Sequence, residues 1–549
     1  MCIRDSPARD AKARSANAMS RCDRVRRREN TATPSTASVT DATPERVTMA
    51  VTSGSAAVWT CPGASANSNG GSMTLDSKGV YVSPAADSRI SGKYLIPERS
   101  TEPATLRRRI HGTPSKTPGM DTLRIEGGQV LRPDMTVERA DVLVDRDDGT
   151  ILDIGTDLDA DASETLDADG CLVMPGLVNA HCHVSMTLLR GYADDKELDA
   201  WLREDIWPAE AALTADDIRI GAELGLVEMI RSGTTTFADM YFDVPEIVDA
   251  VENAGLRARL GHGSVTIGKD DDDAWDDIEE SIEIAREFDG AADGRIRTAV
   301  MPHSLTTVGE EYLREAAAEA HEDDIPVHYH ANETTDEVDP IVEERDERPL
   351  SYAKDLGMLT ERDFIAHGVH VDDEEIALLA ETGTGVVHCP ASNMKLASGM
   401  APVQDMLDAG VTVGIGTDGA ASNNDLDMFD EMRDAAMIGK LAADDASAVA
   451  AEDVVRMGTA GSAEAIGLPG GALEVGGVAD IAVVDLDAPH LTPANDLVSH
   501  LAYAARGSDV RHTVCDGQVL MRDREVLTLD QAAVMQRARD AVAALRDRI

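Results

Sequence analysis

The chain has 549 residues, of which 43% are hydrophobic and only 3% aromatic, and its formal net charge is −51. These values predict a globular protein with an aliphatic core, and they exclude nucleic-acid binding and polybasic membrane association, because so acidic a surface repels anionic partners. The chain has no run of 18 apolar residues and its seven cysteines are scattered, so it predicts no transmembrane helix and no disulfide framework, and it fits a reducing cytoplasm.

The charge is distributed unevenly along the chain. Residues 1–120 contain 18 Lys+Arg and 10 Asp+Glu, whereas the other 429 residues contain 32 and 91, a net charge of −59. The first stretch is rich in Ser, Thr, Ala, Pro and Arg without a sustained period, which predicts disorder. It is either a transit peptide or translated upstream sequence ahead of a start at Met120. We favour the second interpretation and treat residues 1–119 as a disordered or non-native leader.

Short strands are expected at both ends of the acidic region. Residues 140–145 alternate apolar and polar side chains and run into the turn Asp147-Asp148-Gly149. The chain returns to strand patterns near residues 481–485 and 510–520 and closes with a helical pattern over 529–546. Residues 120–175 and 466–549 are therefore predicted to form one small composite β-sandwich domain.

Between these ends, residues 176–465 alternate short apolar strands with longer amphipathic segments. This pattern predicts an α/β catalytic domain, a (β/α)8 TIM barrel, in which the carboxyl ends of the strands build the active site. Strands are expected at residues 234–238, 258–262, 326–330, 364–367, 385–388 and 411–415.

Several histidines fall at the predicted carboxyl ends of these strands. His181 and His183 are two residues apart, so both side chains point to one side of a strand and can bind one metal through neutral imidazoles. Two ordinary loop histidines are the alternative. His330 offers a third ligand at another strand end, and Glu333 a general base beside it. His328, two residues before His330, is expected to be a packed core residue.

Asp418 completes this set at the end of an apolar strand, where a turn-capping aspartate is the alternative. Three histidines and one aspartate from separate strand ends predict a catalytic metal site that leaves room for water, because a structural zinc site more often uses cysteines. The cysteines form no CxxC motif and are expected to be small buried residues. These are Cys171, Cys182, Cys389 and Cys515.

The acidic region, about residues 121–549, resembles the amidohydrolase superfamily, and within it the 5-methylthioadenosine/S-adenosylhomocysteine deaminases. The resemblance rests on an ordered series of motifs. They are PGLVNAHCH at 175–183, IWPAE at 206–210, PHS at 302–304, HYHANET at 328–334, AHGVH at 366–370, HCPASNMKL at 388–396, GTDG at 416–419 and GGALEVGGVAD at 470–480.

The resemblance implies a hydrolytic deaminase that converts a 5′-substituted adenosine to the inosine analogue and releases ammonia. It implies one divalent metal, zinc or alternatively iron, held by His181, His183, His330 and Asp418. No lysine lies on the strand that contains His303, so the bridging carboxylated lysine of dinuclear relatives is not expected there.

The same resemblance assigns roles to the residues around the metal. Glu333 and His367 would flank the attacking water, Glu210 would hold the ribose hydroxyls, and His303 would contact the purine or ribose. Asp418 would also orient the water. The expected partner is a small nucleoside, and relatives of this kind are often homo-oligomers.

The sequence departs from the pattern where relatives that accept S-adenosylhomocysteine use arginines. His262 stands at the end of the third barrel strand, and the following loop, 269–275, is acidic and has no arginine. A substrate carboxylate would be repelled there. We therefore expect weak use of S-adenosylhomocysteine and better use of neutral 5′-substituted adenosines.

Two alternative functions are considered. The first is another ring deaminase or chlorohydrolase of the superfamily, of the guanine, cytosine or triazine type, for which a ribose-binding Glu210 has no purpose. The second is a non-catalytic barrel, which predicts that some metal ligands have been lost from the sequence, and none has been lost.

An acidic surface with few lysines also predicts a halophilic protein, because salt near 1 M screens the repulsion between like charges beyond roughly 3 Å.

Overall fold

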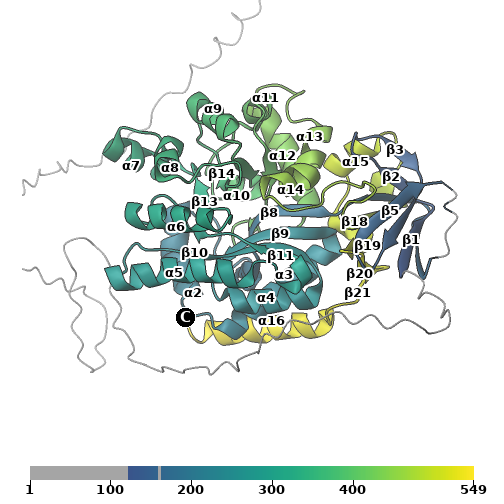
Figure 1. Ribbon diagram of the computed structural model, residues 1–549, viewed down its shortest axis with the longest axis horizontal. Coiled ribbons are helices and arrows are strands. Elements are labelled where there is room, and N and C mark those ends of the chain that lie inside the picture. The colour runs from purple at the N-terminus through teal and green to yellow at the C-terminus, as the bar shows by residue number, and fades with distance from the viewer. Residues whose placement is uncertain (1–120, 157, 159–161) are drawn as a thin grey trace, which may run out of the picture. The chain divides into compact units, whose positions relative to one another are not determined.

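The computed structural model describes residues 121–156, 158 and 162–549 (Figure 1). The predicted leader lies outside these residues. Helices and strands are both abundant, so the α/β class is confirmed. No helix in the described part of the chain combines the length and apolar character needed to cross a membrane.

The N-terminal strands form a four-stranded sheet in the order β5-β4-β1-β6. Leu123 and Ile125 of β1 are fully buried, and they share a core with Leu473 and Ile481, which come from the other end of the chain. The strands of this sheet are β1 (Thr122–Glu126), β4 (Asp141–Asp145), β5 (Thr150–Gly155) and β6 (Glu164–Asp167).

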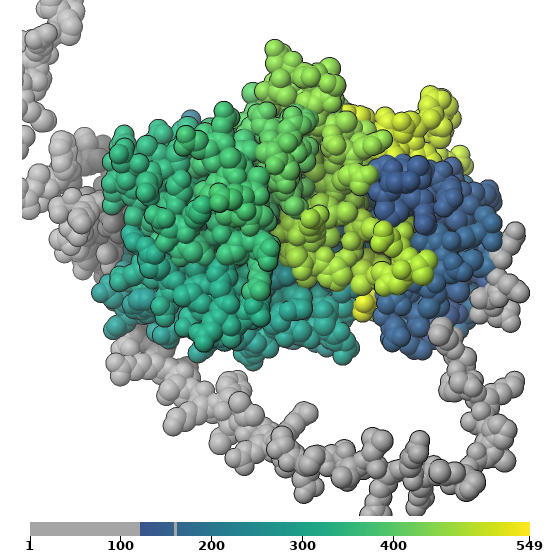
Figure 2. All heavy atoms as spheres, turned by 45° about the horizontal axis from the view of Figure 1, so that its top comes forward, coloured from purple at the N-terminus to yellow at the C-terminus, as the bar shows by residue number. Residues whose placement is uncertain are grey.

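A second sheet joins strands from both ends of the described chain, in the order β21-β20-β19-β18-β7-β2-β3. At its centre Ala482 of β18 pairs antiparallel with Met174 of β7. The N-terminal (blue) and C-terminal (yellow) segments accordingly lie side by side in Figures 1 and 2. The strands are β2 (Gln129–Leu131), β3 (Val137–Arg139), β7 (Cys171–Pro175), β18 (Ile481–Asp485), β19 (Val510–Cys515), β20 (Gln518–Arg522) and β21 (Glu525–Val526).

The remaining strands are parallel and form two arcs, β11-β10-β9-β8-β17 and β13-β14-β15-β16, with β12 paired to β10. The bridges Val300–Val327 and Ser304–His330 connect the arcs on one side. The strands are β8 (Leu177–His183), β9 (Thr234–Tyr241), β10 (Arg257–Ser264), β11 (Ile296–Thr298), β12 (Met301–Pro302), β13 (His328–Ala331), β14 (Phe364–His367), β15 (Gly385–His388), β16 (Val413–Ile415) and β17 (Asp418–Gly419).

On the other side the chain itself passes from β16 in one arc to β17 in the other. Within the described residues, the hydrogen-bonded ladders do not close into one ring, because β16 and β17 are separated by Gly416 and Thr417. Gly416 lies against the backbone of His181, where a Cβ would come within 2.7 Å of a carbonyl oxygen, so only glycine lets the chain pass this close to β8.

Helices cover the parallel strands (Figure 1). The terminal helix α16 packs along α3, whose start is fixed by a capping box between Thr214 and Asp217. The helices are α1 (Leu198–Trp201), α2 (Trp207–Glu210), α3 (Ala215–Ser232), α4 (Val244–Ala254), α5 (Asp271–Phe288), α6 (Glu310–Glu322), α7 (Thr335–Arg345), α8 (Pro349–Leu356), α9 (Asp373–Thr382), α10 (Pro390–Lys395), α11 (Val403–Asp408), α12 (Met428–Ala442), α13 (Ala451–Arg456), α14 (Ser462–Ala465), α15 (Leu497–Tyr503) and α16 (Gln531–Arg546).

The four cysteines of the acidic region are free and buried, as the lack of CxxC spacing predicts. They behave as small apolar residues of the interior, and burial raises the pKa of each thiol.

Candidate metal centre and active site

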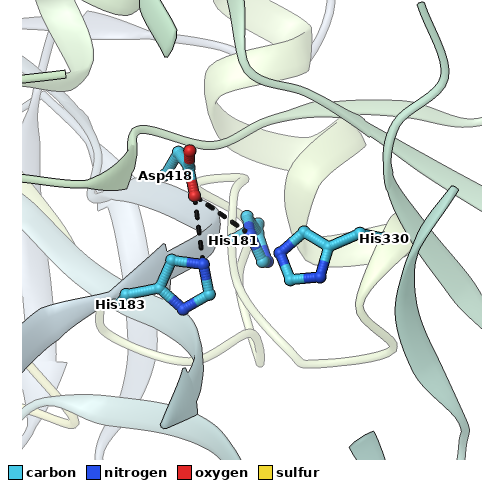
Figure 3. A group of neighbouring side chains, drawn as sticks. All are labelled: His181, His183, His330 and Asp418. Atoms are coloured by element: carbon cyan, nitrogen blue, oxygen red, sulfur yellow. Dashed lines mark ion pairs between the residues drawn. The ribbon is translucent and has the colours of Figure 1, made fainter. Parts of the chain in front are cut away.

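Four side chains from three strands meet at the carboxyl ends of the parallel strands (Figure 3). His181 and His183 come from β8, His330 from β13 and Asp418 from β17. Their candidate ligand atoms all lie within 4.8 Å of one another. The structure therefore brings together the four residues that the sequence proposes as metal ligands.

Hydrogen bonds behind the imidazoles determine which nitrogen of each ring faces the centre. The Nδ1–H of His183 donates to the carbonyl oxygen of Met240 at 2.6 Å, and that of His330 donates to the carbonyl oxygen of His303 at 2.7 Å. When these rings are neutral, Nε2 of each keeps a lone pair directed to the centre, which is the tautomer that a metal ligand needs.

His328 performs the same task for His181. Its Nδ1–H donates to the carbonyl oxygen of Phe364 at 2.9 Å, so its Nε2 accepts the Nδ1–H of His181 at 2.8 Å. His181 Nε2 is buried and has no hydrogen-bond partner. An orphaned buried nitrogen at the centre of this group fits a metal ion, since such atoms are costly to leave unpaired. His328 is fully buried and packs on Phe364, which agrees with the prediction of a core residue.

Asp418 supplies the negative charge of the centre. Its Oδ1 lies 3.1 Å from His183 Nε2 and 3.4 Å from His181 Nε2, while its Oδ2 accepts hydrogen bonds from the hydroxyls of Ser392 and Ser422, each at 2.6 Å. One carboxylate oxygen is therefore held by the protein and the other is directed to the centre.

The electrostatics of the group favour a cation. Burial lowers the pKa of His181 to about 4 and that of His330 well below its usual range, which keeps both rings neutral. Burial also opposes charge on His183, but the hydrogen bond to Asp418 prevails and raises its pKa to about 9. The pair thus attracts positive charge, and a divalent cation would take the place of the proton.

Backbone strain accompanies these strand ends. Asn332, His367 and Asp418 have φ values of 55°, 76° and 58°, in the left-handed region that residues with a side chain seldom adopt. Such conformations persist where the surrounding structure enforces them, and they concentrate at functional sites.

A cavity of about 850 Å³ opens onto this centre. Its lining includes all the non-metal site residues proposed from the sequence, Glu210, His303, Glu333 and His367, and also three of the four proposed ligands, His183, His330 and Asp418. His181 lies beneath them and is fully buried.

The model of the amidohydrolase family matches residues 172–520, more than half of the chain. The chain belongs to the amidohydrolase family. It is 69% identical over 429 residues to a 5-methylthioadenosine/S-adenosylhomocysteine deaminase of Haloarcula marismortui, a match that covers 78% of this chain and 99% of the relative. A 5′-deoxyadenosine deaminase of Methanothermobacter thermautotrophicus is 44% identical over 426 residues, with coverage of 77% and 99%.

A solved structure has the same fold as this chain. An adenosine deaminase from Xanthomonas campestris with bound zinc superposes with a TM-score of 0.73 at 37% identity, over 78% of this chain and 99% of that one. The resemblance to 5-methylthioadenosine/S-adenosylhomocysteine deaminases is therefore confirmed.

In this amidohydrolase, Glu333 and His367 face each other beside the metal centre. Glu333 Oε2 lies 3.6 Å from His367 Nε2, and burial raises the pKa of Glu333. Sequence reasoning missed their supports. Ser398 donates to Glu333 Oε1 at 3.2 Å, and the side-chain oxygen of Asn393 lies 3.0 Å from His367 Nδ1. Both belong to or follow the HCPASNMKL motif, but no spacing rule connects them to these partners.

Glu210, at the end of α2, and His303, directly after β12, both line the cavity. The hydroxyl of Tyr241 donates to Glu210 Oε1 at 2.8 Å, and burial raises the pKa of Glu210 to about 7. His303 Nδ1 lies 3.0 Å from the Thr307 hydroxyl, and burial lowers its pKa to about 3, so the ring is neutral.

His262 does not line the cavity. It is buried, and its Nε2 lies 3.1 Å from Asp277 Oδ1, a carboxylate that also pairs with Lys269 at 2.8 Å. Neither His262 nor the acidic loop 269–275 lines the cavity, so their charges do not indicate which substrate charge the cavity accepts.

Proposed function

We infer that this chain is a metal-dependent hydrolytic deaminase of 5′-substituted adenosines, which yields the inosine analogue and ammonia. The observation that carries this conclusion is the His181–His183–His330–Asp418 centre at the base of a cavity that also contains Glu333, His367 and Glu210. The adenosine-analogue deaminases among its relatives support it.

One divalent metal, which we propose to be zinc with iron as the alternative, would lower the pKa of a water molecule to near neutrality. Zinc is favoured because neutral imidazoles and one carboxylate suit it, and because the structural relative from Xanthomonas campestris holds zinc.

Asp418 and Glu333 would carry out the proton transfers of the reaction. Water adds to C6 of adenine, and Asp418 takes the proton that the water loses. Glu333 gives a proton to a ring nitrogen, then takes one from the added oxygen and passes it to the amine, which leaves as ammonia. Asp418 returns its proton to Glu333. His367 stabilises the charge that develops on the oxygen at C6.

Glu210 is assigned to the ribose hydroxyls and His303 to the purine or ribose. A free base or a triazine offers nothing to Glu210, so this carboxylate favours a nucleoside over the ring deaminase and chlorohydrolase alternatives.

Ammonia release across a substrate panel tests the function. Purified protein should carry about one metal per chain and release ammonia from methylthioadenosine, 5′-deoxyadenosine or adenosine, but not from guanine, cytosine or a chlorotriazine. Activity confined to the free bases or the triazine would overturn the assignment.

We also propose that the parallel strands constitute a (β/α)8 barrel, with β11 and β12 as one interrupted strand and β16 and β17 as another. Residues 120–175 and 466–549 would form the small composite domain beside the catalytic domain, 176–465. A homo-oligomer and a cytoplasmic location remain predictions; light scattering in high salt tests the first.

The acidic surface leads to a prediction about salt. Exposed acids such as Asp271, Asp272 and Asp273 at the start of α5 repel one another when counterions are scarce. We expect Tm to fall by more than about 5 °C between 2 M and 0.1 M KCl, which corresponds to roughly 2–3 kcal/mol for a domain of this size. Calorimetry at both salt concentrations measures this, and an unchanged Tm would contradict a halophilic adaptation.

A further inference from the structure

Two residues, Gly416 and Thr417, lead the chain from β16 to the proposed metal ligand Asp418. The ladder between β15 and β16 ends at Ile415, and the ladder between β17 and β8 begins at Asp418. Gly416 still donates its N–H to the carbonyl oxygen of His388 at 3.0 Å. Among the described strands, none pairs with Thr417. Asp418 therefore starts a strand of two residues directly after a residue that needs other partners for its backbone.

The side-chain amides of two asparagines are these partners. Asn179 Oδ1 accepts the N–H of Thr417 at 3.0 Å, and Asn179 Nδ2 donates to Thr417 Oγ1 at 2.7 Å. Asn423 Nδ2 donates to the carbonyl oxygen of Thr417 at 2.8 Å. The hydroxyl of Thr417 in turn donates to the carbonyl oxygen of Asp418 at 3.1 Å. Both backbone polar groups of Thr417 are thus bound by side chains, as the backbone of a neighbouring strand would bind them.

The contact with Asn179 joins two parts of the metal centre. Asn179 lies on β8, two residues before His181. Asn179 and Thr417 are fully buried, where a hydrogen bond is strong and its loss leaves a polar group unpaired. Asp418 has a φ of 58°, a conformation that persists only where its surroundings enforce it. The amide of Asn179 thus connects the segment of Asp418 to the strand that carries two of the histidine ligands.

Asn423 is held in turn by a buried carboxyl group. Glu431 of α12 is buried, and its Oε1 accepts a hydrogen bond from Asn423 Nδ2 at 2.5 Å. Its Oε2 lies 3.4 Å from the backbone nitrogen of Ala391. Ala391 and Asn423 each lie next to a serine that donates to Asp418 Oδ2. Glu431 therefore ties together the two segments that hold the carboxylate of Asp418.

We propose that the amides of Asn179 and Asn423 position the metal ligand Asp418 by replacing the β-ladder at the residue before it. Neither asparagine lines the cavity, so each acts through Asp418 and not on the substrate. They are positioning residues whose loss weakens metal binding. This inference rests on the metal site of the proposed deaminase function.

The test measures the dissociation constant for zinc, by competition with a chromophoric chelator, in the wild type and in Thr417→Val. Valine has nearly the shape of threonine but cannot accept the hydrogen bond from Asn179, so a buried donor loses its partner. We expect zinc affinity to fall about 10- to 100-fold, the range for residues that hold a metal ligand in place. Thr417→Ser keeps the hydroxyl and should bind zinc nearly as tightly as the wild type.

Thr384→Val is the matched control. Thr384 is also fully buried, and its hydroxyl donates to the carbonyl oxygen of Thr360 at 3.0 Å. It directly precedes β15, at the amino end of a parallel strand, whereas the metal centre lies at the carboxyl ends. Both valine variants should lower Tm, but only Thr417→Val should lower zinc affinity. A purely structural role of these hydrogen bonds predicts a lower Tm in both variants and unchanged zinc affinity.

Asn423→Ala is the second variant, and it decides the question if Thr417→Val does not fold, because Asn423 is only partly buried. It removes the donor to the carbonyl oxygen of Thr417 and should also weaken zinc binding. Unchanged zinc affinity in the folded variants, or an equal loss in Thr384→Val, would overturn the proposal. A wild type that binds zinc but releases no ammonia from any adenosine would instead overturn the deaminase function, and the zinc measurements would still decide the role of the two asparagines.

Discussion

Glu333→Gln is expected to lower kcat by about 10²- to 10⁴-fold, the range that general acid–base catalysis contributes. Glu333 is buried, burial raises the pKa of its carboxyl, and it lies 3.6 Å from His367 Nε2 at the cavity wall, where it can transfer a proton. Glutamine keeps the shape and the hydrogen bond from Ser398 but cannot transfer a proton.

Metal content separates this effect from a damaged site. Glu333 is not among the four ligands, so Glu333→Gln should retain about one metal per chain, measured by atomic emission, and the Tm of the wild type. Near-normal turnover in this variant would show that the proton carrier is a different group.

His181→Ala is expected to remove the metal and the activity together. His181 is the most deeply buried of the four proposed ligands, and its Nε2 has no hydrogen-bond partner. Loss of a residue that only hydrogen-bonds to a metal ligand lowers metal affinity roughly 10–100-fold, so loss of His181 itself should lower metal affinity by more than that. Metal per chain should fall from about one to near zero after dialysis, and ammonia release should fall to background.

His321→Ala is the control for this prediction. His321 pairs with Asp363 outside the cavity, so its removal should leave metal stoichiometry and turnover unchanged. Chelation of the wild type followed by addition of one equivalent of zinc should restore activity. An active His181→Ala enzyme without bound metal would contradict a metal-dependent reaction.

Much of the site can be predicted from local sequence because its ligands are local in origin. His181 and His183 share one strand, and residues two apart on a strand share a face whatever the rest of the fold does. His330 and Asp418 each end an apolar segment, and parallel strands align their carboxyl ends. Their convergence within 4.8 Å follows from this rule.

Other features have no local signal. Ser392 and Ser422 fix Asp418 from separate segments, and the chain of hydrogen bonds from Phe364 through His328 determines the tautomer of His181. The surroundings of His262 likewise have no local signal. The resemblance puts His262 where relatives that accept S-adenosylhomocysteine use an arginine, but in the structure its partner is Asp277 and it lies outside the cavity lining.

The sequence by itself determined the α/β class, the four candidate ligands and the acidic surface, because each depends on composition or on the direction of side chains within one element. Only the tertiary structure decided which nitrogen each histidine presents, which hydroxyls hold Asp418, and which side chains line the cavity, because each of these depends on packing between distant parts of the chain.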